Sequence, residues 1–463
     1  MAIIPQRRLF SWDDVENLGE LKRLKLVLAA LPDEPFMLHL ERDRANGRDD
    51  YPIRAVWNSI LAGVVFQHPS MESLRRELLR NAQLRQVCGF DPVKDAEKAV
   101  PTPSACSRFL DILIEHQDEI DKIFDRLVEC LREELPDFGR FLACDSKGIP
   151  THARPRGREK YEELLEERRR EGPDRRRDLD ADMGKKTYRG KREDGSRYET
   201  VKKWFGYKLH LIVDTEYELP VGYEVTPASR PDNKVFPDLL DGVGESHGEL
   251  LKAAEAMVGD KGYDDVKILN KLWDGYGIAP IIPKRDDWQG DQTRLLSEDE
   301  RYITYNCQGR LFCYSPGNGT VRHMVHWGFE PQRDGQKWRC PVAVYDGICQ
   351  GRSLCCGKSE YGRVVRVPRD YDPRTFTPVA RTSLKFERLY RKRPAVERVN
   401  SRVDVSFGFE RHFIRGQAKM RLRCSLALMV MLAMALGRTR EKNRQEGQED
   451  KTAPTVRSLV GAA

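Results

Sequence analysis

Five short apolar segments between residues 140 and 284 limit the possible folds more than any other feature of the chain. Each reads as a strand because it is a short apolar run bounded by polar or turn-forming residues: FLACDS, GYKLHLIVD, LPVGYEVTPA, AMVGD and IAPIIPK. Helical spacing at about 234–243 and 264–276 separates the later strands. The resulting β-β-β-α-β-α-β order predicts an α/β domain with a mixed five-stranded sheet and flanking helices.

Residues 1–135 show a different pattern, in which apolar residues recur at helical spacing. Four segments carry this pattern: Leu21–Leu31, Ile53–Phe66, Met71–Leu84 and Ser107–Leu131. Pro101 and Pro103 interrupt it, and either Thr102 or Ser104 is expected to cap the next helix. The sequence therefore predicts an all-α N-terminal module. It would serve either as a DNA-binding unit with a helix-turn-helix-like part or as a dimerisation or packing domain.

The segments that follow differ in composition from both of these regions. Residues 153–203 hold 18 Lys/Arg and 13 Asp/Glu with few large apolar residues. Such a segment cannot form a core, so we expect a charged, partly disordered loop that is helical around Tyr161–Arg170. Residues 285–382 lose regular periodicity and hold six of the eleven cysteines. They are interpreted as a Cys-rich, β-rich insertion between the sheet of 136–284 and the helices of 383–440.

The C-terminal part contains the longest apolar run, Leu426–Leu436, which is too short to span a bilayer and is expected to be a buried helix. Residues 441–463 are polar and are expected to form a disordered tail. The N-terminus shows no long apolar leader, and the eleven cysteines follow no disulfide pattern. These features favour a reducing cytoplasm and no membrane partner.

Charge is distributed unevenly along the chain. The whole chain carries a formal net charge of +7, but residues 381–440 hold 15 Lys/Arg against 4 Asp/Glu, a net +11, so the remainder carries −4. A basic segment on an otherwise nearly neutral protein is typical of a phosphate-binding surface, although a solvated helix face would have the same composition. We expect this surface to contact DNA.

Two aspartates, Asp145 and Asp260, lie at or just after the ends of predicted buried strands. A buried carboxylate is costly unless it is paired, binds a metal or caps a following turn. A third candidate is Glu397, which shares one face of a predicted helix with Tyr390 and Arg393 because their spacing is i, i+3 and i+7. An ordinary surface ion pair is the alternative for Glu397. Three carboxylates from separate elements form the oxygen-only ligand set that Mg²⁺ or Mn²⁺ prefers.

Four stretches, in this order, resemble the DDE-type transposases of insertion sequences: CDSKGIPTHA, GYKLHLIVDTEYELPVGYEVTPASRPDN, VGDKGYDD and YRKRPAVE. VGDKGYDD is similar to the family's D-x-G-(F/Y) pattern, and YRKRPAVE is similar to its Y-x2-R-x3-E pattern. The resemblance covers about residues 140–282 and 384–438 and extends more weakly to 51–110. In this family a lysine often follows seven residues after the glutamate, whereas this chain has Asp404 there.

This resemblance implies an RNase H-like catalytic domain in which Asp145, Asp260 and Glu397 bind two Mg²⁺ or Mn²⁺ ions. The ions would support phosphodiester cleavage and strand transfer at the ends of an insertion sequence. Tyr390 and Arg393 would contact DNA, and Arg398 or Arg402 would supply the phosphate contact that Asp404 cannot.

The family also implies partners and a location. The partners would be the terminal inverted repeats, the target DNA and a second copy of the chain, in the cytoplasm at the nucleoid. Two alternatives remain open: a domesticated or inactive DNA-binding regulator, and a stand-alone RNase H-like DNA nuclease.

The cysteines of the insertion lie within 50 residues of one another. Structural zinc needs four thiolate or imidazole ligands, and Cys340, Cys349, Cys355 and Cys356 are the predicted set. Cys307, Cys313, His323 and His326 are close in sequence and could also contribute. Because the insertion contains no C-x2-C pair, ordinary buried thiols remain an alternative.

Overall fold

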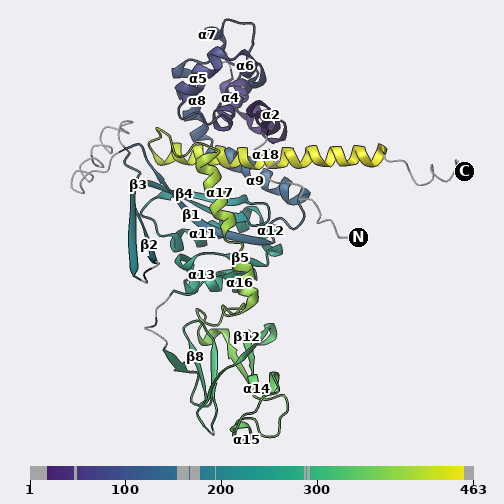
Figure 1. Ribbon diagram of the computed structural model, residues 1–463. Helices are drawn as coiled ribbons and strands as arrows, with labels where there is room; N and C mark the ends of the chain where they lie inside the picture. Colours follow the sequence, from purple (N-terminus) through teal and green to yellow (C-terminus); the bar gives the residue numbers. More distant parts are fainter. Residues whose placement is uncertain are drawn as a thin grey trace, which may run out of the picture.

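A mixed sheet forms the centre of the protein (Figure 1). The computed structural model describes residues 18–45, 50–153, 166, 178–192, 194, 196–285, 288, 292–316 and 318–452. The strands of this sheet are β1 (Phe141–Pro150), β2 (Asp182–Lys191), β3 (Arg197–Asp214), β4 (Leu219–Pro227), β5 (Ala256–Val258) and β6 (Ala279–Ile281). Their order is β2-β3-β1-β5-β6, and β4 also pairs with β3. β1 runs antiparallel to β3 and parallel to β5, which is parallel to β6.

All five predicted strands are present, and β2 is an additional strand. It pairs with the first half of β3, so part of the segment expected to be a charged loop is a β-hairpin. That expectation was wrong for 182–203 because backbone hydrogen bonds hold a hairpin together without a buried core. Side chains there are mostly exposed. Apart from Glu166, the predicted helix around Tyr161–Arg170 lies outside the described residues.

The N-terminal region is helical, as predicted. Its helices are α2 (Glu20–Ala30), α3 (Glu34–Arg44), α4 (Ile53–Val65), α5 (Met71–Arg80), α6 (Ala82–Cys88), α7 (Ala96–Ala99), α8 (Pro103–Glu115) and α9 (Gln117–Glu134). Thr102 caps α8 by accepting the backbone N–H of Ala105 at 3.2 Å, one of the two predicted caps. The predicted helix Met71–Leu84 is divided at Asn81, which caps α6. The predicted helix Ser107–Leu131 is divided at His116, between α8 and α9.

Helix α18 (Gln417–Thr452) crosses between the N-terminal helices and the sheet (Figure 1). Its apolar run is buried, as predicted, and the helix packs against α9, α2 and β4. By length and composition α18 could cross a membrane, but 89% of its apolar window is buried inside the protein, as in the core helix of a soluble protein. The prediction of a disordered tail from residue 441 was wrong up to Thr452, because the helix propagates beyond its packed part, and 453–463 lie outside the described residues.

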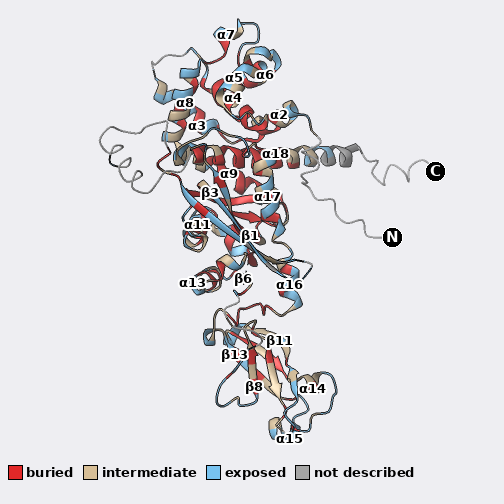
Figure 2. Ribbon diagram, turned by 60° about the vertical axis from the view of Figure 1, so that its left-hand side comes forward, coloured by how far each residue is buried: buried red, intermediate tan, exposed pale blue. Residues whose placement is uncertain are grey.

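One continuous hydrophobic core joins the N-terminal helices, the sheet and α18 (Figure 2). Helices α11 (Asp232–Ser246), α12 (Gly248–Ala253) and α13 (Val266–Asn270) add buried residues to it. The core therefore includes both the predicted N-terminal module and the sheet. The strands that bear the candidate aspartates are held by this core.

The helix predicted to carry Tyr390, Arg393 and Glu397 is two helices, α16 (Leu384–Tyr390) and α17 (Pro394–Val405). The chain divides here because Pro394 has no N–H, and its ring would clash with the carbonyl of Tyr390, four residues earlier, so it starts a new helix. Pro394 instead occupies the first turn of α17, where a missing N–H costs nothing.

The segment between β6 and α16 contains two small antiparallel sheets below the central sheet (Figure 1). The first has the order β10-β9-β8-β7 and the second β11-β12-β13. Their bounds are β7 (Thr293–Leu295), β8 (Ile303–Asn306), β9 (Leu311–Tyr314), β10 (Val321–His323), β11 (Val325–Glu330), β12 (Gly335–Arg339) and β13 (Val364–Pro368). Two short helices, α14 (Pro341–Val344) and α15 (Arg352–Cys355), follow β12. A second, smaller core that includes Trp338 and Phe376 holds this region together.

Candidate active site

Asp145 and Asp260 come from neighbouring parallel strands. Ala143 pairs with Val258 in the ladder between β1 and β5, so each aspartate follows its paired residue by two positions. Adjacent strands lie about 4.8 Å apart, and side chains two positions apart point to the same face. The two carboxylates therefore lie at the same level of the sheet.

Asp145 lies inside β1, not at its end as predicted from the apolar run, because pairing with β3 continues to Pro150. Its side chain is buried, and one oxygen accepts the backbone N–H of Ser146 at 2.8 Å. Burial raises the pKa of Asp145, and the charge on Asp260 adds to this rise, while Lys186 and Arg393 oppose it. A buried carboxylate that repels a second one is a position where a cation would be stabilised.

Asp260 follows β5 and caps the short 3-10 helix η1 (Lys261–Tyr263) by accepting the backbone N–H of Gly262 at 2.7 Å. The capping role that the sequence left open is therefore present. One carboxylate oxygen is used in this cap. Gly259 precedes Asp260 and faces Cys144, and a Cβ atom there would lie 3.1 Å from the Cys144 sulfur. A glycine at this position lets the strand that carries Asp260 approach β1 closely.

Glu397 and Asp145 meet at the guanidinium group of Arg393. One nitrogen of Arg393 lies 2.7 Å from a Glu397 oxygen, and another lies 3.9 Å from an Asp145 oxygen. Burial lowers the pKa of Arg393, but the charges of Asp145 and Glu397, with smaller contributions from Tyr390 and Asp260, raise it overall. Arg393 thus joins Glu397 to Asp145, and the pairing of β1 with β5 places Asp260 beside Asp145, although the predicted single helix is broken.

Tyr390 lies half-buried beside this group and stacks on Phe386 with ring centroids 6.0 Å apart. Burial raises the pKa of its hydroxyl; Asp260 and Glu397 act in the same direction, while Arg393 opposes them. Tyr390 ends α16 and Arg393 caps α17, so the break at Pro394 lets both helices contribute to the site.

The other predicted DNA-binding arginines have protein partners. Arg398 and Arg402 lie 2.6 Å and 2.5 Å from the two carboxylate oxygens of Glu218, at the turn between β3 and β4. This clamp fixes α17 on the sheet. Asp404, which departs from the family pattern, forms an ion pair with Lys147 of β1. The positive charge that the family's lysine would bring is therefore supplied next to position 404 by Lys147. Lys147 lies on β1, two residues after Asp145.

A pocket opens beside Asp145 and has a basic lining, in which Lys147, Lys186, Lys202 and Trp204 are prominent. The indole of Trp204 lies over Gly148 of β1 and Gly184 of β2, where a Cβ atom would overlap the ring. Its ring N–H donates to the carbonyl of Tyr207 at 3.1 Å, which fixes its orientation. Three lysines and an aromatic face thus surround the opening next to the buried carboxylate.

Residues near the base of the insertion brace the turn after Asp260, and these were not predicted from the sequence. Arg285 donates to the carbonyls of Lys261 and Gly262 at 2.8 Å and 2.6 Å. Asp264, in the same motif, accepts the backbone N–H of Arg285 at 2.9 Å and pairs with Arg374 at 2.6 Å. The DD ending of VGDKGYDD was the available signal, since a buried second aspartate needs a partner.

The cysteines of the insertion lie near one another at its far end. Burial raises the pKa of the Cys313 thiol to about 11, and Cys340, Cys355 and Cys349 add to the rise. The Cys349 sulfur lies 3.7 Å from the Ser315 hydroxyl, and Arg363 lies 3.7 Å from the Cys355 sulfur. Cys356, a member of the predicted set, interacts with Cys355 and Cys340. The thiols grouped around Cys313 therefore include three of the four predicted zinc ligands.

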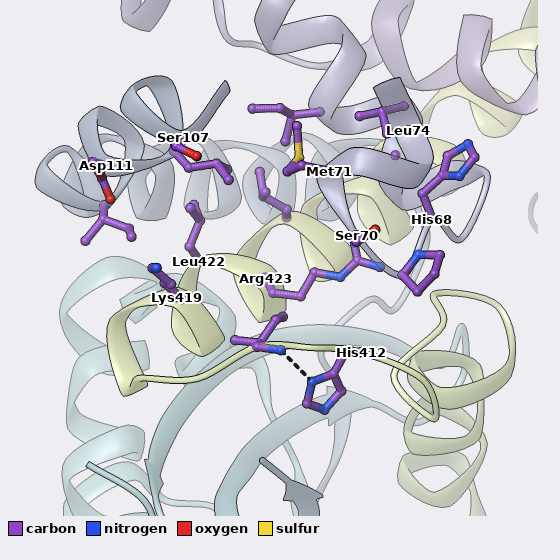
Figure 3. A pocket seen from close by; sticks show the side chains of 17 residues that line it. His68, Ser70, Met71, Leu74, Ser107, Asp111, His412, Lys419, Leu422 and Arg423 are labelled. Carbon is purple, nitrogen blue, oxygen red and sulfur yellow. Dashed lines mark hydrogen bonds between the residues drawn. The ribbon is translucent and has the colours of Figure 1, made fainter. Parts of the chain in front are cut away.

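An apolar cavity elsewhere lies between α4, α5, α8 and the start of α18 (Figure 3). Met71, Leu74 and Leu422 line it, with His412 and Arg423 at one side. It contains none of the predicted catalytic carboxylates. The basic pocket beside Asp145 is the opening that has the matching chemistry.

Comparison with known proteins agrees with this geometry. A family model described as the transposase DDE domain matches residues 136–433, which include β1, the insertion, α17 and most of the buried part of α18. A search of curated proteins found no match. Because the family model covers more than half of the chain, the protein belongs to the family of transposases with a DDE domain.

Proposed function

We propose that this protein cuts DNA at the ends of an insertion sequence and joins those ends to target DNA, with Asp145, Asp260 and Glu397 as its catalytic carboxylates. The meeting of three carboxylates from separate elements carries the proposal: Arg393 contacts both Asp145 and Glu397, and the pairing of β1 with β5 places Asp260 beside Asp145. The strand order β4-β3-β1-β5-β6, with β4 and β3 antiparallel and β5 and β6 parallel, is compatible with an RNase H-like domain.

The donor set fits divalent metal ions. It consists of carboxylate oxygens only, it includes a buried carboxylate with a raised pKa, and it already gathers around the positive charge of Arg393. Asp145, Asp260 and Glu397 would hold two Mg²⁺ or Mn²⁺ ions, which supply charge stabilisation for the attacking and leaving oxygens of a phosphodiester. Arg393 would then exchange a carboxylate partner for a DNA phosphate.

The basic pocket supports a DNA path next to these carboxylates. Lys186 and Lys202 lie on the hairpin of β2 and β3, where they would attract the phosphates of the strand to be cut. Trp204 would offer an aromatic face to a base of that strand. Tyr390 and Arg393 would contact the DNA from the opposite side. Arg398 and Arg402 would do so only if they left Glu218.

The central experiment replaces each carboxylate by its amide: Asp145→Asn, Asp260→Asn and Glu397→Gln. Cleavage of DNA that carries the element's terminal inverted repeats, measured with Mg²⁺, should fall by at least about 1000-fold, or about 4 kcal/mol in activation free energy. Binding to the same DNA, measured by mobility shift, should remain. Glu410→Gln, an exposed glutamate after α17, is the matched control and should cut normally. Any of the three variants that cuts at the wild-type rate is not a catalytic carboxylate.

The same assay separates the proposal from its alternatives. Cleavage followed by joining to a target plasmid supports a transposase. Cleavage without joining under all conditions would indicate a stand-alone nuclease, and binding without cleavage an inactive regulator. Two DNA ends per protein dimer are expected in the paired complex, measurable by light scattering. We place the reaction in the cytoplasm, on nucleoid DNA.

Arg393→Ala tests the role of the central cation. If Arg393 contacts a phosphate, DNA affinity should fall and the slope of log affinity against log salt should decrease by about one. Arg391→Ala is a suitable control, since Arg391 is exposed on the same segment and pairs with Glu387. An unchanged salt slope in Arg393→Ala would limit Arg393 to holding the carboxylates.

We also propose a structural zinc ion in the insertion, bound by Cys313, Cys340, Cys349 and Cys355. In this proposal Cys313 replaces Cys356 as the fourth ligand. Cys340, Cys355 and Cys349 all raise the pKa of the Cys313 thiol, so it lies near the other three. Among the described residues no three of these sulfur atoms lie within 4.8 Å of one another, so zinc binding would require the thiols to approach. Zinc analysis of the purified protein should find loss of about one equivalent in Cys313→Ser, while Cys307→Ser keeps it. Equal zinc in both variants would remove Cys313 from the site.

A further inference from the structure

Two histidines and an aspartate meet among the N-terminal helices, far in sequence from the catalytic carboxylates. His39 and Asp43 lie one turn apart on α3, and His116 lies at the joint between α8 and α9. The Nε2 atoms of His39 and His116 are each 3.4 Å from the same oxygen of Asp43. Among the described residues, this is the group that brings three such ligand atoms within 4.8 Å of one another.

The distances fit a shared metal ion better than they fit hydrogen bonds. A hydrogen bond between an imidazole N–H and a carboxylate is about 2.7–3.2 Å long, shorter than both contacts. In a tetrahedral zinc site with metal–ligand distances of about 2.0–2.1 Å, neighbouring ligand atoms lie about 3.3–3.4 Å apart. The two contacts of 3.4 Å therefore match two edges of such a tetrahedron.

The histidine rings are positioned by packing. The rings of His39 and His116 meet edge-to-face at 5.1 Å, with an interplanar angle of 87°. Phe36, which is buried one turn before His39, contacts the ring of His116 at 6.1 Å and that of Trp57 at 5.7 Å. Trp57 in turn donates to Asp33, at the start of α3, at 2.5 Å. Both imidazoles are therefore attached to the buried core, and little ordering is needed to form the site.

The site is open to solvent and has a further carboxylate beside it. Side-chain exposures are 45% for His39, 50% for Asp43 and 24% for His116, so an ion could enter and keep a water ligand. Glu119, in the first turn of α9, pairs with Lys122 at 2.7 Å. The backbone N–H of Glu119 donates to the carbonyl of His116 at 3.1 Å, so Glu119 lies one turn of chain from that ligand.

We propose that His39, Asp43 and His116 bind a zinc ion that fastens α3 to the joint between α8 and α9. Two imidazoles and one carboxylate form a nitrogen-rich set that selects Zn²⁺ over the Mg²⁺ preferred by carboxylates alone. Water, or Glu119 after release from Lys122, completes the coordination. The site is chemically distinct from the thiols of the insertion.

The experiment uses the full-length protein, first stripped of metal with a chelator and then titrated with Co²⁺ as a spectroscopic substitute for Zn²⁺. The His39→Gln, His116→Gln double variant should lose one equivalent of Co²⁺. The difference spectrum between wild type and variant should show ligand-field bands without thiolate charge transfer. Zn²⁺ affinity at the remaining ligand should be weakened at least about 100-fold. Asp118→Asn, which changes an exposed carboxylate next to His116, is the control and should bind as wild type does.

Stability gives a second readout. Zn²⁺ should raise the melting temperature of the wild type and of Asp118→Asn by more than that of the double variant, with all three equal after chelation. If the double variant has a lower melting temperature even without metal, the measurement is repeated with Asp43→Asn, which keeps both histidine rings. Equal Co²⁺ stoichiometry in wild type and variants, or a difference spectrum with thiolate bands, would overturn the proposal.

Discussion

The central sheet and the insertion are both β-structures, but they are stabilised differently. The sheet belongs to one continuous core that includes α18 and the N-terminal helices. The insertion has its own core, which holds Ile303, Leu311, Trp338 and Phe376 among a few other side chains, and its strands are three to six residues long. A small core yields little net stability, so such a region depends on cross-links or on its attachment to a larger one.

The attachment between these two regions is polar. Asp264, whose side chain is fully buried, pairs with Arg374 at 2.6 Å and Arg381 at 3.5 Å. Arg381 also donates to the carbonyl of Ile282 at 2.8 Å, and Lys284 donates to Thr375 at 2.6 Å. Burial lowers the pKa of Arg381 to about 10, although Asp264 opposes this. Each region therefore has an apolar interior, while the contact between them is mainly polar, with the buried Asp264 at its centre and an edge-to-face contact of Trp273 with Phe329 beside it.

The turn after Asp260 is braced by residues at the base of the insertion. Asp264, which holds the buried pairs, also accepts the backbone N–H of Arg285, and the exposed side chain of Arg285 donates to the carbonyls of that turn. Movement of the insertion would be transmitted to Asp260 through them. The candidate carboxylates thus depend on the large core for position, and Asp260 also depends on the insertion for support of its turn.

The largest effect is expected from Trp338→Ala, which removes a fully buried side chain from the small core. The change should cost about 3–5 kcal/mol, enough to unfold the insertion by itself. Leu211→Ala in β3 should cost about 2–5 kcal/mol but lower the stability of the whole large core. Hydrogen exchange would show local loss of protection in the first variant and global loss in the second. Global loss in both would mean that the insertion is not a separate folding unit.

A smaller effect is expected from Asp264→Asn at the junction. The change leaves Arg374 and Arg381 without a buried counter-charge and should cost about 3 kcal/mol. Limited proteolysis should then cut near residues 283 and 375, which separates the insertion from an otherwise folded protein. The neighbouring Asp265→Asn keeps a side-chain oxygen that can cap α13, so it should cost little and should not cause this cleavage. Equal proteolysis of the two variants would contradict a polar attachment.

The ion pair of Lys147 and Asp404 lies inside the large core region and should contribute less. A double-mutant cycle with Lys147→Gln and Asp404→Asn should give a coupling of about 1–2 kcal/mol, because the two side chains are only partly buried. Unfolding in urea provides the measurement. The exchange of charges, Lys147→Asp with Asp404→Lys, should recover most of the coupling. A coupling near zero would show that this ion pair does not help to hold α17 on β1.

The smallest effect is a pH dependence at His247, which links α12 to α9 through Asp125 at 3.1 Å and Glu129 at 2.8 Å. Burial lowers the pKa of His247, but its bonds to Asp125 and Glu129 raise it above the usual value of about 6.5. The pair therefore stabilises the fold fully below pH 6.5, and its contribution is lost as the pH rises through the higher folded pKa. His247→Gln should cost about 1 kcal/mol at pH 6 and less at pH 9, measured by thermal unfolding. A pH-independent cost would exclude a charged His247.

Much of the local structure was predictable from the sequence. The five strands of the central sheet, the cap at Thr102 and the buried helix at Leu426–Leu436 follow from periodicity and from residue preferences over a few positions. The positions of Asp145 and Asp260 near one another follow from the strand pattern together with the family motifs. Where local patterns failed, a backbone effect dominated: hairpin pairing formed β2, and Pro394 divided the helix that bears Glu397.

Only the tertiary structure decided which distant side chains meet. The contacts of Arg393 with Asp145, of Lys147 with Asp404 and of Arg285 with the Asp260 turn join residues from separate elements. The meeting of His39 with His116, and of Cys313 with Cys340, is of the same kind. Hydrophobic patterning specifies which face of an element is buried, because burial depends on each residue's own side chain. It does not specify which charged or metal-binding groups from other elements face that surface, because that depends on how the packed elements are oriented.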